Sequence, residues 1–420
     1  MLKIFILIYN MVVLIFLAPI LIAIALSGKR NRNDFFYKIK ERLVIYENNP
    51  VFDKNKKTVW VHCASLGEAR AVEPMMEKLK QYNIAVTVIT KSAREYVSKL
   101  SYVKFCALAP VDLYPFAAKA VSKIKPDILL VVETEFWPSL IYCASAANAK
   151  IITVNGRLSK TAFPYYKATS AVWKIFLKPV TRILVRNEQD YERFSAITDM
   201  AGKIEITGNI KYDRDWRSEG FDRSTIGFDG KYFLFTAGST RDGEEEIILD
   251  VFEKLKQKYI NLRLIIAPRH ISRVPEIEAL IKNKNIKYTL FSDSDKKQED
   301  ILLVDVFGKL QMLYSVSDLV FIGGSLIKKG GQNPIEASAY AKPVIFGQHM
   351  YNFENEAKLL KNCAGAFEVS DAASLEETAD RLISDEDLRI MTGNKGFKAV
   401  EEQKGAINKN LEIIEKYINE

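Results

Sequence analysis

The sequence is poor in the residues that build disulfide scaffolds and metal sites. Its 420 residues include four cysteines and three histidines. The cysteines stand far apart, at positions 63, 106, 143 and 363, without the spacing of a disulfide framework or a zinc knuckle. The histidines, at positions 62, 270 and 349, form no HExxH pair. We therefore expect a reduced, cytosol-facing protein with no bound metal and no cofactor.

Other familiar signatures are missing as well. No serine stands in a GxSxG elbow, and the chain has neither a Walker loop nor a GxGxxG run. Asp213-Arg214-Asp215 and Asp293-Ser294-Asp295 resemble the acidic metal motif of some glycosyltransferases, but such triplets often arise by chance in charged loops. The basic excess forms no stripe interleaved with aromatic residues, so nucleic acid is not an expected partner.

One long hydrophobic run stands at the start of the chain. Residues 4–27 are apolar apart from Asn10, Pro19 and Ser27, and as a helix they would measure roughly 36 Å, enough to cross a hydrocarbon core. A cleavable signal peptide is the alternative, but its apolar region is usually shorter, and the flank at 29–42 holds six Lys or Arg against two acids. We expect residues 1–28 to be an uncleaved, single-pass membrane anchor, with the globular body on the cytoplasmic side.

After Pro50, short strand-like runs alternate with amphipathic helical stretches, which is typical of doubly wound α/β sheets. We expect a Rossmann-like domain over 29–212, a polar linker over 213–230 and a second Rossmann-like domain over 231–405. A C-terminal helix over 406–420 is expected to pack back on the first domain. The expected strands are 58–63, 84–90, 103–108, 127–133, 150–154, 182–185 and 203–206, then 232–237, 262–267, 301–304, 318–322 and 343–346.

Acidic residues follow two strands of the first half. Ser65, Gly67 and Glu68 come after VWVHC, where Gly67 permits close approach of a substrate and Glu68 suits a general base. The structural alternative for Glu68 is a first-turn acid favoured by the helix dipole. Glu133 and Glu135 follow ILLVV. Two carboxylates at one strand end are costly unless a cation, a proton or a sugar hydroxyl satisfies them, which favours a functional role. The structural alternative for these residues is helix capping.

Anion-binding patterns follow strands of the second half. Ser239 and Thr240 precede a run of acids, which also suits a capping box, and Arg269-His270 ends another strand. The turn from Gly323 and Gly324 to the segment 330–337 is expected to turn backbone amides toward a phosphate, with Glu336 accepting ribose hydroxyls. The two α/β halves together suggest a ligand at the carboxyl ends of the strands, in a cleft between the domains.

The order of these segments resembles that of the bacterial transferases of 3-deoxy-D-manno-octulosonic acid (Kdo) in lipopolysaccharide biosynthesis. The resemblance runs from the anchor to about residue 360. It is carried by ASLGE (64–68), APVD (109–112), ETEFWP (133–138), NGRLS (155–159), GNIKYD (208–213), GSTRDGEEE (238–246), PRH (268–270), FGKL (307–310), GGSL (323–326), GGQNPIEA (330–337) and NFENE (352–356).

The resemblance implies a metal-independent, inverting glycosyltransferase of the GT-B fold at the inner membrane, which moves Kdo from CMP-Kdo to a lipid A precursor, lipid IVA. It makes 29–212 the acceptor-binding domain and 231–405 the CMP-Kdo-binding domain. It makes Glu68 the general base and links Glu133 or Glu135, together with Lys211, to transition-state stabilisation. It places the CMP contacts on Arg269, His270, Phe307, Gly308, Lys309, Asn333, Pro334, Ile335 and Glu336.

Some positions depart from the family pattern. Gln332 and Arg241 stand where histidine is usual, Lys309 where an acid is common, and the segment after the second strand reads TKSA at 90–93. Two other functions remain open: another nucleotide-sugar enzyme, such as a UDP-sugar transferase or epimerase, and a non-catalytic protein that binds a sugar nucleotide or a lipid.

Overall fold

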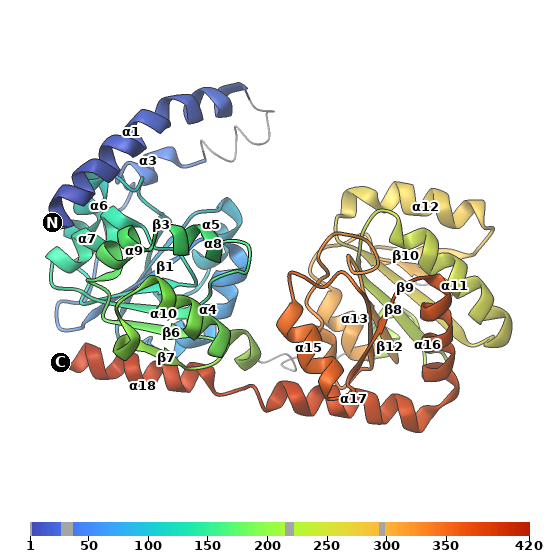
Figure 1. Cartoon of the computed structure of the whole chain (residues 1–420). Helices are drawn as coiled ribbons and strands as arrows, with labels where there is room; N and C mark the ends of the chain where they lie inside the picture. Colours follow the sequence, from blue (N-terminus) through green and yellow to red (C-terminus); the bar gives the residue numbers. More distant parts are fainter. Residues whose placement is uncertain (1, 27–36, 215–221, 294–298) are drawn as a thin grey trace. The chain divides into compact units, whose positions relative to one another are not determined.

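The chain forms two compact α/β units in a computed structural model that describes residues 2–26, 37–214, 222–293 and 299–420 (Figure 1). Unit 1 comprises Met1–Arg214 and Lys404–Glu420, and unit 2 comprises Asp215–Gln403. The division after Arg214 falls inside the expected linker, 213–230, of which residues 215–221 lie outside the described ones.

Unit 1 is built on a sheet of seven parallel strands in the order β3-β2-β1-β4-β5-β6-β7. The five residues of β4 are all buried, which explains the uninterrupted apolar run ILLVV. The strand order reverses between β1 and β4, which pair directly. The strands are β1 (Thr58–Cys63), β2 (Asn83–Val88), β3 (Val103–Leu108), β4 (Ile128–Val132), β5 (Lys150–Gly156), β6 (Arg182–Val185) and β7 (Ile204–Ile206).

Helices cover both faces of this sheet. One apolar core lies between the sheet and α4, α5 and α18, and the other lies under α6, α7, α9 and α10. The helices are α3 (Ile39–Arg42), α4 (Leu66–Lys78), α5 (Lys91–Val97), α6 (Tyr114–Ile124), α7 (Pro138–Ala146), α8 (Phe163–Ala168), α9 (Ser170–Leu177), α10 (Glu188–Ile197) and α18 (Ala406–Asn419), with 3₁₀ turns η1 (Ala201–Lys203) and η2 (Ile210–Asp213).

The C-terminal helix α18 belongs to unit 1, along the lower side of its sheet in Figure 1. Ile407, Leu411 and Ile414 are buried in the core that α18 shares with α4. The carboxylate of Asp213 accepts hydrogen bonds from the backbone N–H groups of Gly405 and Ile407, at the start of the helix. Asp213 of the first acidic triplet thus contributes a helix cap, while Asp215 of that triplet and residues 294–295 of the second lie outside the described residues.

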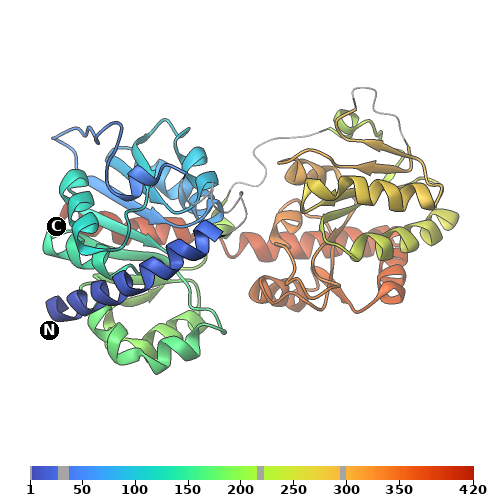
Figure 2. The ribbon, with the colours of Figure 1, turned by 90° about the horizontal axis from the view of Figure 1, so that it is seen from above.

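Helix α1 (Leu2–Leu26) lies along unit 1, next to α7 (Figures 1 and 2). Ile6 and Asn10 are buried against the unit, and the Tyr9 hydroxyl donates to Asp112 at 2.9 Å. Within the described part of the chain, no helix combines the length and the apolar character that crossing a membrane requires. The expected anchor over 1–28 is therefore confirmed as a helix but not as a span, and residues 27–36 of the expected boundary and basic flank lie outside the described ones.

Unit 2 repeats the architecture with a second sheet of seven parallel strands, in the order β10-β11-β9-β8-β12-β13-β14. Two strands, β10 and β14, were not predicted: both lie at an edge of the sheet and are only partly buried, so they lack the continuous apolar run of the interior strands. The strands are β8 (Phe233–Thr240), β9 (Leu262–Pro268), β10 (Tyr288–Leu290), β11 (Ile301–Leu303), β12 (Leu319–Ile322), β13 (Val344–Gly347) and β14 (Ala366–Val369).

The helices of unit 2 again cover two faces, with α11, α12 and α16 over one core and α13 over the other. They are α11 (Glu244–Lys258), α12 (Val274–Asn283), α13 (Leu310–Val316), α14 (Ile335–Ser338), α15 (Glu354–Asn362), α16 (Ala372–Ser384) and α17 (Glu386–Glu401), with 3₁₀ turns η3 (Arg223–Ile226) and η4 (Ile271–Arg273).

Candidate active site

The predicted catalytic residues of unit 1 gather at the carboxyl edge of its sheet. Glu68 lies in the first turn of α4, which follows β1, and Glu133 directly follows β4. β1 and β4 are adjacent at the point where the strand order reverses, which is where open α/β sheets usually bind their ligands. Residues 65 positions apart in the chain are thereby brought to one place.

Glu68 is held in a defined orientation by its own loop. One carboxylate oxygen accepts the Ala64 backbone N–H at 2.7 Å, and the other accepts the Ser65 hydroxyl at 2.9 Å. Burial raises the pKa of this carboxyl, and the charges of Glu133 and Glu135 raise it further, against the opposing effect of its hydrogen bonds. A raised pKa makes the carboxylate a stronger base, which suits it to take a proton from a hydroxyl.

Glu133 forms an ion pair with Lys211, at 2.8 Å between Oε1 and Nζ. Lys211 lies in η2, 78 positions along the chain. Burial alone would raise the pKa of Glu133, but the charges of Lys211, Arg157 and Arg186 lower it below its ordinary value. Glu133 is thus an ionised carboxylate in a cationic environment, and its backbone adopts a left-handed φ of 56°, a conformation that concentrates at functional sites.

Glu135 has a different environment from its neighbour Glu133. It accepts a hydrogen bond from the Trp137 indole at 3.1 Å, and burial raises its pKa, with the charge of Glu133 adding to the effect. The Trp137 ring meets the buried His62 imidazole edge to face, at 4.8 Å between centroids. The structure therefore separates the two acids that sequence reasoning could not: Glu133 is bound to a cation, whereas Glu135 is bound to an aromatic donor.

In unit 2, the turn after β12 differs from the expected phosphate cradle. The backbone N–H groups of Gly324, Ser325 and Leu326 donate to the carboxylate of Glu244, at 2.6, 2.9 and 3.0 Å. The Gly323 N–H donates to the Gly238 carbonyl at 2.8 Å. The expectation that these amides face a phosphate was wrong, because a carboxylate from α11 already occupies them.

The two glycines of this turn have packing roles. A Cβ on Gly323 would lie 2.5 Å from the Ser239 carbonyl oxygen, and Gly324 has a φ of 70°. Gly323 thus lets β8 and β12 approach closely, and Gly324 allows the turn. Whether either also contacts a substrate stays a prediction.

Arg241 lies in this region, and the sequence analysis noted it only as a departure from the family pattern. Its guanidinium Nη1 donates to His270 Nε2 at 2.9 Å. The Thr240 hydroxyl beside it is buried and, among the described residues, has no hydrogen-bond partner, while Ser239 is buried with a φ of 58°. Arg269 and His270 follow β9, which pairs with β8, so the predicted PRH and GST segments meet at one sheet edge.

The remaining predicted contacts lie on nearby loops of unit 2. Phe307 is exposed, Gly308 has a φ of 84°, and Lys309 precedes α13. Asn333 accepts the Ile335 N–H at 3.2 Å, and Pro334 precedes the four-residue α14, which contains Glu336. The described residues contain no cluster of three or more His, Cys, Asp or Glu side chains that could hold a metal ion.

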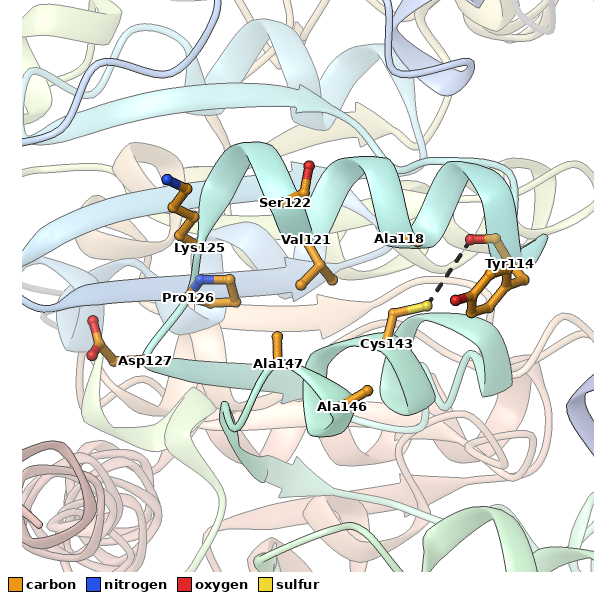
Figure 3. A pocket seen from close by; sticks show the side chains of 10 residues that line it. All are labelled: Tyr114, Ala118, Val121, Ser122, Lys125, Pro126, Asp127, Cys143, Ala146 and Ala147. Atoms are coloured by element: carbon orange, nitrogen blue, oxygen red, sulfur yellow. Dashed lines mark hydrogen bonds between the residues drawn. The ribbon is translucent and has the colours of Figure 1, made fainter. Parts of the chain in front are cut away.

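A groove of about 560 Å³ lies elsewhere in unit 1, between α6 and α7. Its lining runs from Tyr114 to Lys125 on one side and from Cys143 to Ala147 on the other (Figure 3). The Cys143 thiol contacts the Tyr114 carbonyl oxygen at 4.0 Å. None of the predicted site residues lines this groove, so it does not coincide with the candidate active site.

Comparison with known proteins identifies the family. Residues 37–214 match the family model described as 3-deoxy-D-manno-octulosonic-acid transferase (kdotransferase). The 3-deoxy-D-manno-octulosonic acid transferase of Haemophilus influenzae is 31% identical over 372 residues, which cover 86% of this chain and 87% of that protein. The chain belongs to the Kdo transferase family.

Two further relatives are similar to most of this chain. The 3-deoxy-D-manno-octulosonic acid transferase of Aquifex aeolicus is 32% identical over 332 residues, which cover 78% of this chain and 87% of that protein. A bifunctional glycosyltransferase/methyltransferase of Fusobacterium nucleatum is 36% identical over 355 residues, which cover 80% of this chain but only 54% of that protein. This chain therefore spans about half of the Fusobacterium protein.

Solved structures share the fold of this Kdo transferase family member. The UDP-GlcNAc 2-epimerase of Neisseria meningitidis bound to UDP-GlcNAc superposes with a TM-score of 0.62 at 15% identity, covering 86% of this chain and 100% of that one. A glycosyltransferase of Rickettsia africae gives 0.59 at 16% identity, covering 87% and 99%. At such identities the likeness concerns the fold alone, and it agrees with the expected pair of parallel-sheet α/β domains.

Proposed function

We propose that this protein is an inverting glycosyltransferase that moves Kdo from CMP-Kdo to a lipid A precursor. The observation that carries the proposal is the grouping of Glu68 with the Glu133–Lys211 pair at the point where the strand order of unit 1 reverses. Membership of the Kdo transferase family indicates which sugar is transferred, and the different environments of Glu68 and Glu133 indicate their roles.

The reaction requires one proton to leave and one bond to break. The acceptor hydroxyl gives its proton to the Glu68 carboxylate as its oxygen bonds to the anomeric carbon of Kdo. The bond from that carbon to the CMP phosphate breaks, and the phosphate oxygen keeps the electron pair. In this proposal, Lys211 supplies positive charge near the reacting centre, where Glu133 fixes the ammonium in place.

Donor binding is proposed for unit 2. Arg269, His270 and Lys309 offer cationic or hydrogen-bonding groups to an anionic nucleotide, while Asn333 and Glu336 stand where a ribose could be held. The leaving CMP would be met by such side chains and not by the amides of residues 324–326, since Glu244 holds those.

We further propose that α1 attaches the protein to the cytoplasmic face of the inner membrane. Its outward face is strongly apolar, with Leu7, Met11 and Ile15 more than half exposed. A groove of about 650 Å³ separates this helix from the start of α6, with a largely apolar lining and Lys3 at its side. Such a surface suits an acyl chain next to a phosphate-bearing headgroup, as in a glycolipid acceptor.

Transfer of Kdo from freshly generated CMP-Kdo to a tetraacylated lipid A precursor tests the activity, with the full chain in detergent and mass spectrometry of the product. Glu68→Gln is expected to lower kcat by about 100- to 10,000-fold, because the amide cannot accept the proton. Glu77→Gln, at an exposed position of the same helix, is the matched control and should retain full rate. A wild-type protein that is folded and inactive with this pair of substrates would refute the proposed function.

A further inference from the structure

The carboxylate of Glu244 is completely buried in unit 2 and accepts four backbone hydrogen bonds. Three come from the turn at Gly324, Ser325 and Leu326, and the fourth comes from the Arg241 N–H at 3.0 Å. A buried charge is tolerated only when such donors satisfy it. Glu244 therefore joins two loops, those that follow β8 and β12, which lie about 80 positions apart in the chain.

Polar side chains from three segments converge beside this junction. A Cβ placed on Gly324 would lie 3.6 Å from Arg241 Cγ and 3.7 Å from Gln332 Nε2, so both side chains flank the open space over that glycine. The Arg241 guanidinium reaches on to His270, as an Nη1 donor to Nε2. Its Nε has no hydrogen-bond partner among the described residues.

We propose that Glu244 is a positioning residue for the nucleotide-sugar site of unit 2, and that the group it positions is Arg241. The buried carboxylate fixes the Arg241 backbone against the 324–326 turn, so that the side chain passes Gly324 and its guanidinium reaches His270. An arginine held in this way presents N–H donors to the phosphate of a nucleotide without having to be ordered on binding. This inference rests on the proposed function, because it takes the ligand of unit 2 to be a cytidine nucleotide.

Glu244→Gln is the decisive variant. The amide keeps the shape of the side chain, but its NH₂ group faces backbone N–H donors and cannot accept from them. Asp318→Asn is the matched control, since Asp318 also joins β8 to β12 by accepting a backbone N–H, from Leu234 at 2.8 Å, but at the opposite end of these strands. A general weakening of unit 2 would affect both variants, whereas misplacement of Arg241 is specific to Glu244→Gln.

The affinity for CMP, measured by calorimetry on the full chain, and the KM for CMP-Kdo are the two measurements. Glu244→Gln is expected to weaken CMP binding and to raise this KM by about tenfold or more, with kcat changed by less than about threefold, because a binding group is displaced and the catalytic acids of unit 1 are untouched. Asp318→Asn should leave both quantities unchanged. Unaltered CMP affinity in Glu244→Gln, or a loss confined to kcat, would overturn the inference.

Arg241→Gln covers the case in which Glu244→Gln does not fold. Arg241 is only partly buried, so its side chain can be shortened without disturbing the core, and the same loss of CMP affinity is expected. Full affinity in this variant would overturn the inference. If the wild type binds CMP but transfers no Kdo, the proposed reaction is refuted, and the comparison of CMP affinities still decides the role of Glu244. If the wild type binds no CMP, the proposed function and the role of Glu244 are both refuted.

Discussion

The ion pair of Glu133 and Lys211 yields a sharp prediction about unit 1. Its atoms lie 2.8 Å apart, and the side chains are 16% and 36% exposed. At an effective dielectric constant of about 20, Coulomb attraction at this distance is about 6 kcal/mol, most of which is offset by the removal of both charges from water. Exposed pairs couple by about 0.2–1 kcal/mol, and breaking fully buried pairs costs about 3–5 kcal/mol, so this half-buried pair should couple by about 1.5–2 kcal/mol.

A double-mutant cycle measures this coupling. Glu133→Gln, Lys211→Met and the double variant are compared with the wild type by urea unfolding at pH 7, followed by the fluorescence of Trp60, Trp137 and Trp173 in unit 1. The pair Lys174–Asp199 is the control: it has a similar distance of 2.7 Å, but its side chains are more exposed, at 41% and 75%, so its coupling should stay below about 0.5 kcal/mol.

The dependence on pH adds a second check. The pKa of Glu133 is lowered in the folded protein, so its stabilising contribution is present above its unfolded value of about 4.3 and is lost as the pH falls through the lower, folded value. The coupling should therefore be constant from pH 7 to pH 5 and decrease in more acidic solution. A coupling at pH 7 no larger than that of the Lys174–Asp199 pair would refute the reasoning.

Two further predictions concern His62 and Gly323. Burial lowers the pKa of His62 to about 4, so the unfolded chain binds a proton at a higher pH than the folded one. Unit 1 should therefore lose stability as the pH falls from about 6.5 to 4, by up to about 1.4 kcal/mol per pH unit. His62→Gln should reduce this dependence of the unfolding free energy on pH, and an unchanged dependence would contradict a buried neutral imidazole. Gly323→Ala should destabilise unit 2 by about 1–3 kcal/mol in thermal unfolding, because the added Cβ would meet the Ser239 carbonyl oxygen. Gly230→Ala should be nearly neutral, because a Cβ there has no atom within 4 Å. Equal effects of the two substitutions would argue against the close approach of β8 and β12.

Much of the fold could be predicted because parallel strands leave a strong local signal. Buried strands such as ILLVV at 128–132 are continuous apolar runs, and helices stand between most of the successive strands. The strands β10 and β14 were missed, since both lie at an edge of the sheet and are only partly buried, without a continuous apolar run. Glu68, Glu133 and Lys211 could be proposed because each stands in a recognisable motif near a strand end or turn.

The partners of these residues could not be predicted in the same way. Nothing in the segment 133–138 distinguishes the two acids, yet the fold pairs Glu133 with Lys211 and Glu135 with the Trp137 indole. The glycines at 323–324 suggested a phosphate cradle by local pattern alone. For the amides of 324–326 that expectation was wrong, because a carboxylate from a helix that starts some 80 residues earlier accepts their hydrogen bonds.

The alternation of strands and helices, the division into two α/β units and the residue types at the strand ends could be derived from the sequence, since they depend on burial periodicity and short motifs. Which of those residues meet depends on the three-dimensional fold. Strand order places β1 beside β4, and thereby Glu68 beside Glu133, and it brings Glu244 under the 324–326 turn. The reason is physical: hydrogen bonds, ion pairs and desolvation act over a few ångströms of space, and the distance between two residues in space is set by the packing of the whole sheet and not by their separation along the chain.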